Sequence, residues 1–142
     1  MNKLKLEYKG VIYSKKNSKR IVTNWRTRRP IIVSNRNAKN QERAMAYDFE
    51  IQARREGWPE LEQTEEQRAN HQYRIEIEVW QKDLRRRDLD NQATAILDGL
   101  VASGVILDDS CDMVQKLSVE YKGVDRDDPR AEITITELAW EI

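Results

Sequence analysis

Cysteine and histidine are nearly absent from this sequence of 142 residues, which has only Cys111 and His71. One cysteine cannot form an internal disulfide, so a disulfide-stapled secreted domain is excluded and a reducing compartment is expected. One histidine excludes most histidine-rich metal sites and makes a Ser-His-Asp or Cys-His mechanism difficult to assemble. Any catalysis is therefore expected to use carboxylates, lysines, or a hard cation held by oxygen ligands.

Long apolar runs are also missing. No stretch approaches the roughly 20 residues that a membrane-spanning helix needs, and no apolar signal segment follows the N-terminal Met1–Lys5. Glycine and proline are scarce, at five and three residues, which argues against a disordered or fibrous chain. We expect one domain over residues 1–142, in the cytoplasm, that is long enough to bury a core without metals or disulfides.

The charges balance in number but not in position. Lys and Arg number 25, as do Asp and Glu, yet residues 1–43 carry 13 basic and two acidic side chains, a net charge of +11. Residues 44–142 carry the remaining 12 basic side chains against 23 acidic ones, a net charge of −11. A basic arm can meet phosphate while acidic clusters can hold cations.

The apolar periodicity predicts an α+β (mixed α/β) fold with one mixed sheet and two main helices. The predicted strands are residues 3–8, 21–23, 30–33, 73–80, 114–121 and 131–138, and the predicted helices are residues 38–56 and 91–103, the second with residues 88–90 leading into it. The second and third strands flank a basic segment and are expected to form a hairpin. Residues 58–71 are polar, include His71, and are expected to form a surface connection with a capped turn at Thr64.

Two pairs of aspartates lie at the ends of the second predicted helix. Asp88 and Asp90 precede it, while Asp108 and Asp109 follow it; a helix cap and an ordinary turn would account for them without function. However, a helix of this length spans ~20 Å, and residues 104–109, if extended, can retrace about that distance. Carboxylates gathered in this way are tolerated when a divalent cation neutralises them, and oxygen ligands favour Mg²⁺ or Mn²⁺.

Arg85, Arg86 and Arg87 immediately precede the first aspartate pair. Three consecutive arginines are often no more than a solvated loop, but beside a metal site they can guide phosphate. Metal-bound carboxylates and a phosphate guide are the parts that phosphodiester hydrolysis requires.

Taken together, these segments resemble the signature of the RusA family of Holliday junction resolvases. The resemblance is strongest over residues 85–109, where it is carried by Arg86–Asn91 (Arg-Arg-Asp-Leu-Asp-Asn), Asp98–Leu100 (Asp-Gly-Leu) and Gly104–Asp109 (Gly-Val-Ile-Leu-Asp-Asp). The basic Ser14–Ser18 loop with its following hairpin, and the Ile-Thr-Ile-Thr strand near the C-terminus, are similar to members of that family as well.

The resemblance implies a small homodimeric endonuclease that cuts two opposed strands of a four-way DNA junction, using Mg²⁺ or Mn²⁺. Such proteins are commonly encoded by phages or prophages, which places this one at the nucleoid of a bacterial or phage-infected cell. The family's catalytic and metal-binding aspartates correspond to Asp88, Asp90 and Asp109, with Asp108 as an adjacent ligand. The family's lysine, four residues after its second aspartate, is replaced here by Thr94, and we expect Lys16 to take its role.

The candidate DNA-binding residues lie in the N-terminal loop, the hairpin and the arginine run. They are Lys15, Lys16, Asn17, Lys19, Arg20, Arg26, Arg28, Arg29, Arg85, Arg86 and Arg87. Trp25 lies among the basic hairpin residues, where stacking on an unpaired base and packing on the hairpin are equally compatible with the sequence. Two alternatives stay open: a catalytically weak DNA-binding or interaction module of the same fold, which Thr94 favours, and a nuclease directed at RNA or flaps.

Overall fold

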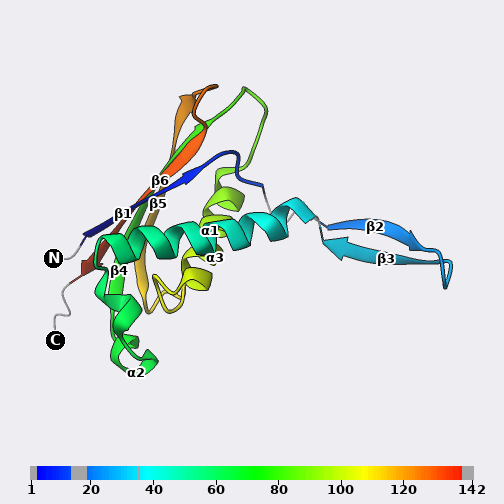
Figure 1. Ribbon diagram of the computed structural model, residues 1–142. Helices are drawn as coiled ribbons and strands as arrows, with labels where there is room; N and C mark the ends of the chain where they lie inside the picture. The colour runs from blue at the N-terminus through cyan, green and yellow to red at the C-terminus, as the bar shows by residue number, and fades with distance from the viewer. Residues whose placement is uncertain (1–2, 14–18, 35, 139–142) are drawn as a thin grey trace.

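The computed structural model describes residues 3–13, 19–34 and 36–138, so Lys15, Lys16 and Asn17 of the candidate set lie outside the described residues. Figure 1 shows the arrangement of the elements along the chain. In order they are β1 (Lys3–Lys9), β2 (Lys19–Asn24), β3 (Arg29–Ser34), α1 (Arg36–Arg55), the 3-10 turn η1 (Pro59–Glu62), α2 (Glu65–Arg68), β4 (Gln72–Gln81), α3 (Leu89–Ser103), β5 (Val114–Val124) and β6 (Arg130–Leu138).

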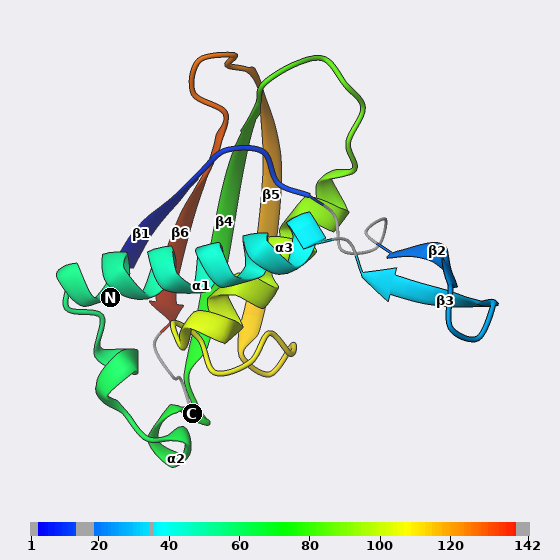
Figure 2. The same ribbon diagram turned by 45° about the vertical axis from the view of Figure 1, so that its right-hand side comes forward.

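Four strands form a mixed sheet in the order β1-β6-β4-β5. The β1–β6 and β4–β6 pairs are antiparallel, whereas β4 and β5 are parallel. A parallel pair needs a crossover connection, and α3 with the residues after it supplies this connection. Both α1 and α3 cover the same face of the sheet (Figure 2). The mixed α/β content and the mixed sheet predicted from the sequence are confirmed.

The core lies between this sheet and the two long helices. The alternating residues of β4 point inward, as predicted: Tyr73, Ile75, Ile77 and Val79 are all buried. The four-residue spacing in α1 also buries the expected side chains, which are Met45, Phe49 and Ala53. At the crossing of α1 with α3 there is room only for a glycine, because a Cβ atom on Gly99 would lie 2.9 Å from Met45 Cβ.

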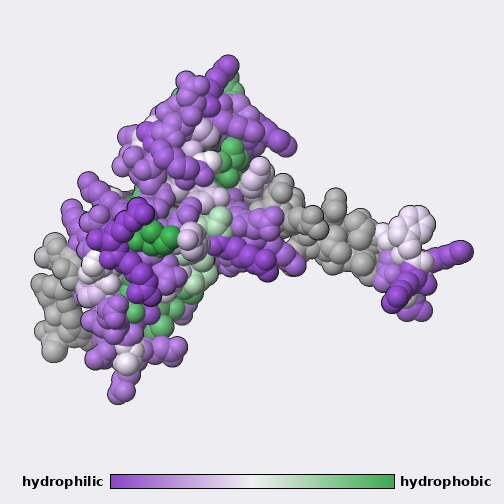
Figure 3. Space-filling view, viewed as in Figure 1, coloured by the Kyte–Doolittle hydropathy of each residue, from purple (hydrophilic) through white to green (hydrophobic). Residues whose placement is uncertain are grey.

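The β2–β3 hairpin forms, but it is a separate two-stranded ribbon and not part of the main sheet. Its register pairs Lys19 with Ser34 and Asn24 with Arg29. The ribbon projects away from the sheet and helices (Figure 1), and the space-filling view shows hydrophilic side chains at its tip (Figure 3). The strand pattern in the sequence is therefore right, while the expectation of a single sheet holds only for the other four strands.

Residues 58–71 differ from the expected surface connection. The capped turn is present, with Gln67 N donating to Thr64 Oγ1 at 3.2 Å, but the segment also packs inward. Trp58 Nε1 donates to Val105 O at 2.9 Å, and Arg68 Nη2 donates to Gly104 O at 2.6 Å. The segment thus fixes the backbone that leaves α3 and leads to the second aspartate pair.

Across the three described ranges, none of the helices combines the length and the apolar character that crossing a bilayer requires.

Candidate active site

The first aspartate pair lies at the N-terminus of α3. Asp88 occupies the N-cap position with an extended backbone, yet its side chain makes no capping hydrogen bond. Its Oδ2 atom accepts only a long contact from Asn91 Nδ2, at 3.4 Å, and Asp90 Oδ1 accepts from Asn91 N at 2.9 Å. Both aspartates are exposed. The partial positive charge of the helix N-terminus stabilises these carboxylates, which remain accessible to a ligand.

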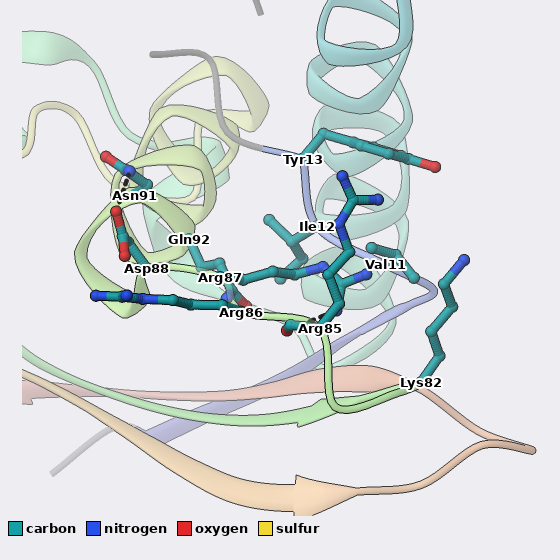
Figure 4. Close-up of a pocket in the computed structure, with 10 residues that line it drawn as sticks. All are labelled: Val11, Ile12, Tyr13, Lys82, Arg85, Arg86, Arg87, Asp88, Asn91 and Gln92. Atoms are coloured by element: carbon teal, nitrogen blue, oxygen red, sulfur yellow. Dashed lines mark hydrogen bonds between the residues drawn. The ribbon is translucent and has the colours of Figure 1, made fainter. Parts of the chain in front are cut away.

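Asp88 lines a cleft of about 680 Å³ that is open to solvent. The segment from Val11 to Tyr13 forms one wall, and Lys82 with the three consecutive arginines forms the other (Figure 4). The lining therefore holds four cationic side chains and one carboxylate, which suits a phosphate group that approaches a bound cation.

The three arginines of this cleft do not have equivalent roles. The Arg87 side chain is only 15% exposed and its Nη1 atom donates to Asp83 Oδ1 at 2.8 Å and to Gln81 Oε1 at 3.2 Å. The Arg87 hydrogen bond holds the pKa of Asp83 below its ordinary value, with a further contribution from the Arg85 backbone N–H. Arg87 therefore shapes the loop, whereas Arg85 and Arg86 are exposed and available to a phosphate.

The second aspartate pair lies beyond the C-terminus of α3. The helix ends at Gly104, whose φ of +81° is favourable for glycine. Partial burial raises the pKa of the Asp109 carboxyl, and the negative charges of Asp108 and Asp98 raise it further. Asp98 lies eight residues after Asp90, or ~12 Å along a helix axis. The chain after α3 therefore keeps Asp109 within electrostatic range of Asp98.

The four predicted metal ligands do not gather as tightly as ligands around one ion do. Among the described residues, Asp88, Asp90, Asp108 and Asp109 are not part of any group of three with ligand atoms within 4.8 Å of one another. Residues 104–109 do not run extended as the length estimate assumes, because the backbone bends at 105–107 and Val105 and Ile106 are fully buried. The extended length of these residues is consequently shortened before Asp109 is reached.

Thr94 stands where the family lysine would be, one turn into α3. Its Oγ1 atom donates to Asp90 O at 2.9 Å, so the side chain is bonded back to its own helix. The residue is exposed and carries no charge, and it therefore cannot offset charge on a phosphate as a lysine would.

The basic hairpin residues form a second cationic region on the ribbon. Arg26, Arg28 and Arg29 are exposed at its tip, and Lys19 and Arg20 belong to β2. The ribbon projects away from the body that carries the cleft (Figure 1).

A buried ionic group that sequence reasoning missed lies below the exit of α3. Glu60, His71 and Glu137 have ligand atoms within 4.8 Å of one another, and the Glu60 side chain is fully buried. His71 Nδ1 contacts Glu60 Oε1, while Arg68 Nε lies 3.3 Å from Glu60 Oε2. The sequence predicts His71 at the surface; its side chain is 23% exposed and contacts the buried Glu60, so it is only partly a surface residue. Because Arg68 already neutralises Glu60, the group acts as an ionic support of the fold; no spacing in the sequence signals it.

Comparison with known proteins identifies the family. A family model described as endodeoxyribonuclease RusA matches residues 12–136, which include all of the cleft lining except Val11, both aspartate pairs and the basic ribbon. The comparison with curated proteins found no match. The family match covers most of the chain and confirms the resemblance found in the sequence. The chain therefore belongs to the RusA endodeoxyribonuclease family.

Proposed function

We propose that this protein is a divalent-metal-dependent endonuclease that resolves four-way DNA junctions by paired nicks, in recombination and repair. The observation that carries the proposal is the pair of exposed carboxylates at the start of α3, beside a cleft with four cationic side chains. A pure DNA-binding surface gains nothing from carboxylates that face phosphate. We place its action on chromosomal or phage DNA in the cytoplasm of a bacterial or phage-infected cell.

The donor set fits a hard cation. Asp88 and Asp90 offer exposed carboxylate oxygens without a strong hydrogen-bond partner for Asp88, and oxygen donors favour Mg²⁺, with Mn²⁺ as a substitute. When bound, such an ion lowers the pKa of water and stabilises the leaving oxygen. Arg85 and Arg86 hold the phosphate in the cleft, while Arg87 keeps their loop in place.

We further propose that the protein acts as a homodimer. Two opposed cuts in a junction of two-fold symmetry are matched most simply by a two-fold protein. Within one chain no three of the four predicted ligands have ligand atoms all within 4.8 Å of one another, so a movement of side chains or loop, or a second copy, must complete the site. The hydrogen bonds to Gly104 O and Val105 O restrain the start of this loop, and a mixture of variants decides between the two routes.

The proposal is tested with a labelled mobile four-way junction incubated with the protein and Mg²⁺, Mn²⁺ or EDTA. We expect cleavage with either metal and none with EDTA, and we expect Asp90→Asn to abolish cleavage while junction binding is retained or tightened. Asp112→Asn, an exposed aspartate in the loop after α3, is the matched control and should cleave normally. Unchanged cleavage by Asp90→Asn would remove Asp90 from the site.

Mixing two inactive variants distinguishes the two ways of completing the site. Where Asp109 crosses to the partner subunit, a heterodimer of Asp90→Asn and Asp109→Asn chains regains one intact site and nicks a single strand. Where each site belongs to one chain, both sites of that heterodimer are defective and the mixture stays inactive. A light-scattering mass of one chain at micromolar concentration, with and without junction, would exclude the dimer itself.

A catalytically weak DNA-binding module is the second candidate, and Thr94 is the observation that favours it. Its hydroxyl is bonded to Asp90 O and no lysine occupies this turn of α3. Junction binding without metal-dependent cleavage by the unmodified chain would support this candidate. If the activity is only slow, Thr94→Lys should raise the single-turnover rate, and Lys16→Ala should lower that rate more than it lowers binding.

A further inference from the structure

The tip of the β2–β3 ribbon presents one aromatic side chain to solvent. Trp25 is 87% exposed, the highest value among the large hydrophobic side chains whose burial the structure describes. The turn that carries it is well defined: Arg28 N donates to Asn24 O at 2.6 Å, and Arg26 N donates to Asn24 Oδ1 at 3.0 Å. The indole is therefore held out by a structured turn, at the end of an arm that projects from the protein (Figure 1).

The charge of the ribbon indicates what this indole meets. Residues 19–34 contain five Lys and Arg residues and no Asp or Glu. Arg28 has a φ of +57°, a left-handed conformation that glycine or asparagine adopts more easily than arginine. An arginine at this position keeps a third cation at the tip beside Arg26 and Arg29, which suits a polyanion.

The surroundings of Trp25 distinguish between the possible partners. Its neighbours along the tip, Asn24, Arg26 and Thr27, are polar, so the indole is flanked along the turn by polar and cationic side chains. A protein groove or a membrane is generally met by several apolar side chains together. An aromatic ring among arginines is the arrangement that stacks on a nucleic-acid base while its flanking cations hold phosphates.

Duplex DNA does not offer such a base, because the faces of its bases are covered by their neighbours in the stack. A branch point or a single strand exposes a base face, and stacking there discriminates branched from linear DNA. We propose that Trp25 is a base-stacking residue that binds an unstacked base at a DNA branch point, with Arg26 and Arg28 on the adjacent phosphates. The choice of branched DNA rests on the proposed function, but the stacking itself does not depend on cleavage.

The test measures binding to a mobile four-way junction, a single strand and a linear duplex in EDTA, where no cleavage interferes. Loss of a base–aromatic stack weakens binding by roughly 10-fold or more. We expect Trp25→Ala to lose that factor on the junction and the single strand with little change on the duplex, and Trp25→Phe to keep most of the affinity. Tyr47→Ala is the matched control, because Tyr47 is an aromatic side chain on α1 that is 67% exposed; it should change none of the three affinities.

A fluorescent base analogue, 2-aminopurine, placed at the branch point reports stacking directly. We expect quenching on binding of the unmodified chain and of Tyr47→Ala, but not of Trp25→Ala. Equal loss on all three DNAs, unchanged junction affinity, or a changed oligomeric mass for Trp25→Ala would overturn the proposal. The cleavage assays and the binding assays are independent of each other. If the unmodified chain does not cleave the junction, the enzymatic part of the proposed function is wrong, but the binding results in EDTA still test whether Trp25 stacks on a base.

Discussion

Replacement of Arg68 by methionine measures the energetic contribution of the buried ion pair under the exit of α3. The Glu60 side chain is fully buried and the Arg68 side chain is only 10% exposed, with Arg68 Nε 3.3 Å from Glu60 Oε2. Arg68 also donates to Gly104 O at 2.6 Å. Removal of one partner from a buried pair costs about 3–5 kcal/mol, because the remaining charge is left in a low-dielectric interior.

We expect Arg68→Met to lower the free energy of unfolding by about 3 kcal/mol, the lower end of that range. The reason is that His71 Nδ1 still contacts Glu60 Oε1 after the arginine is removed. Such a loss is large beside a total stability of about 5–15 kcal/mol for a domain. Urea denaturation followed by far-ultraviolet circular dichroism gives both the midpoint and the slope, and the slope should not change.

Arg54→Met is the matched control for this measurement. The Arg54 guanidinium lies closer to its partner, with Nη2 2.9 Å from Glu50 Oε1, but the two side chains are 54% and 44% exposed. Exposed pairs contribute about 0–1 kcal/mol, so burial predicts a small effect here although the distance is shorter. If Arg54→Met destabilises the protein as much as Arg68→Met does, burial is not the source of the Arg68 contribution and the reasoning fails.

Two further predictions concern α3. Gly99→Ala should destabilise the protein by about 1–2 kcal/mol in the same urea assay, because the added Cβ atom lies 2.9 Å from Met45 Cβ. The strain of overpacking exceeds the gain in helix propensity, which is roughly 1 kcal/mol. An increase in the free energy of unfolding would contradict the close crossing of α1 and α3. Asp98→Asn should lower the pKa of Asp109, because a repelling charge is removed. Carboxyl NMR titration measures it, and an unchanged pKa would show that the two side chains do not interact.

Much of the fold could be predicted from the sequence because most elements carry their own periodicity. The alternation over residues 73–80 locates β4 (Gln72–Gln81) to within one residue at each end, and the predicted end of α3 at Ser103 is also observed, although the helix begins two residues before the predicted start. The support under α3 could not be predicted. Glu60 is acidic and lies in a polar stretch, which is typical of a surface, and its burial depends on Arg68 and His71, which the fold brings to it.

In the candidate site too, features set by neighbouring residues could be predicted from the sequence, whereas contacts made by the folded chain could not. Helix chemistry places Asp88 and Asp90 at the start of α3, and the run of arginines predicts a cationic surface beside them. The sequence does not show that Arg87 turns inward to Asp83, because three consecutive arginines are chemically identical until the loop folds.

The path of the chain after α3 decides which residues can take part in one site. A helix end followed by six residues has enough length to return to the helix start, and length alone favours a site within one chain. The folded path is shorter, because Trp58 and Arg68 hold the carbonyl oxygens of Val105 and Gly104 from the opposite side. The buried segment that the sequence did not reveal thus fixes the first residues of the path that leads to Asp109. Residues 106–109 lie beyond these two hydrogen bonds, so a movement of Asp108 and Asp109 and a second copy can each complete the site with both bonds intact.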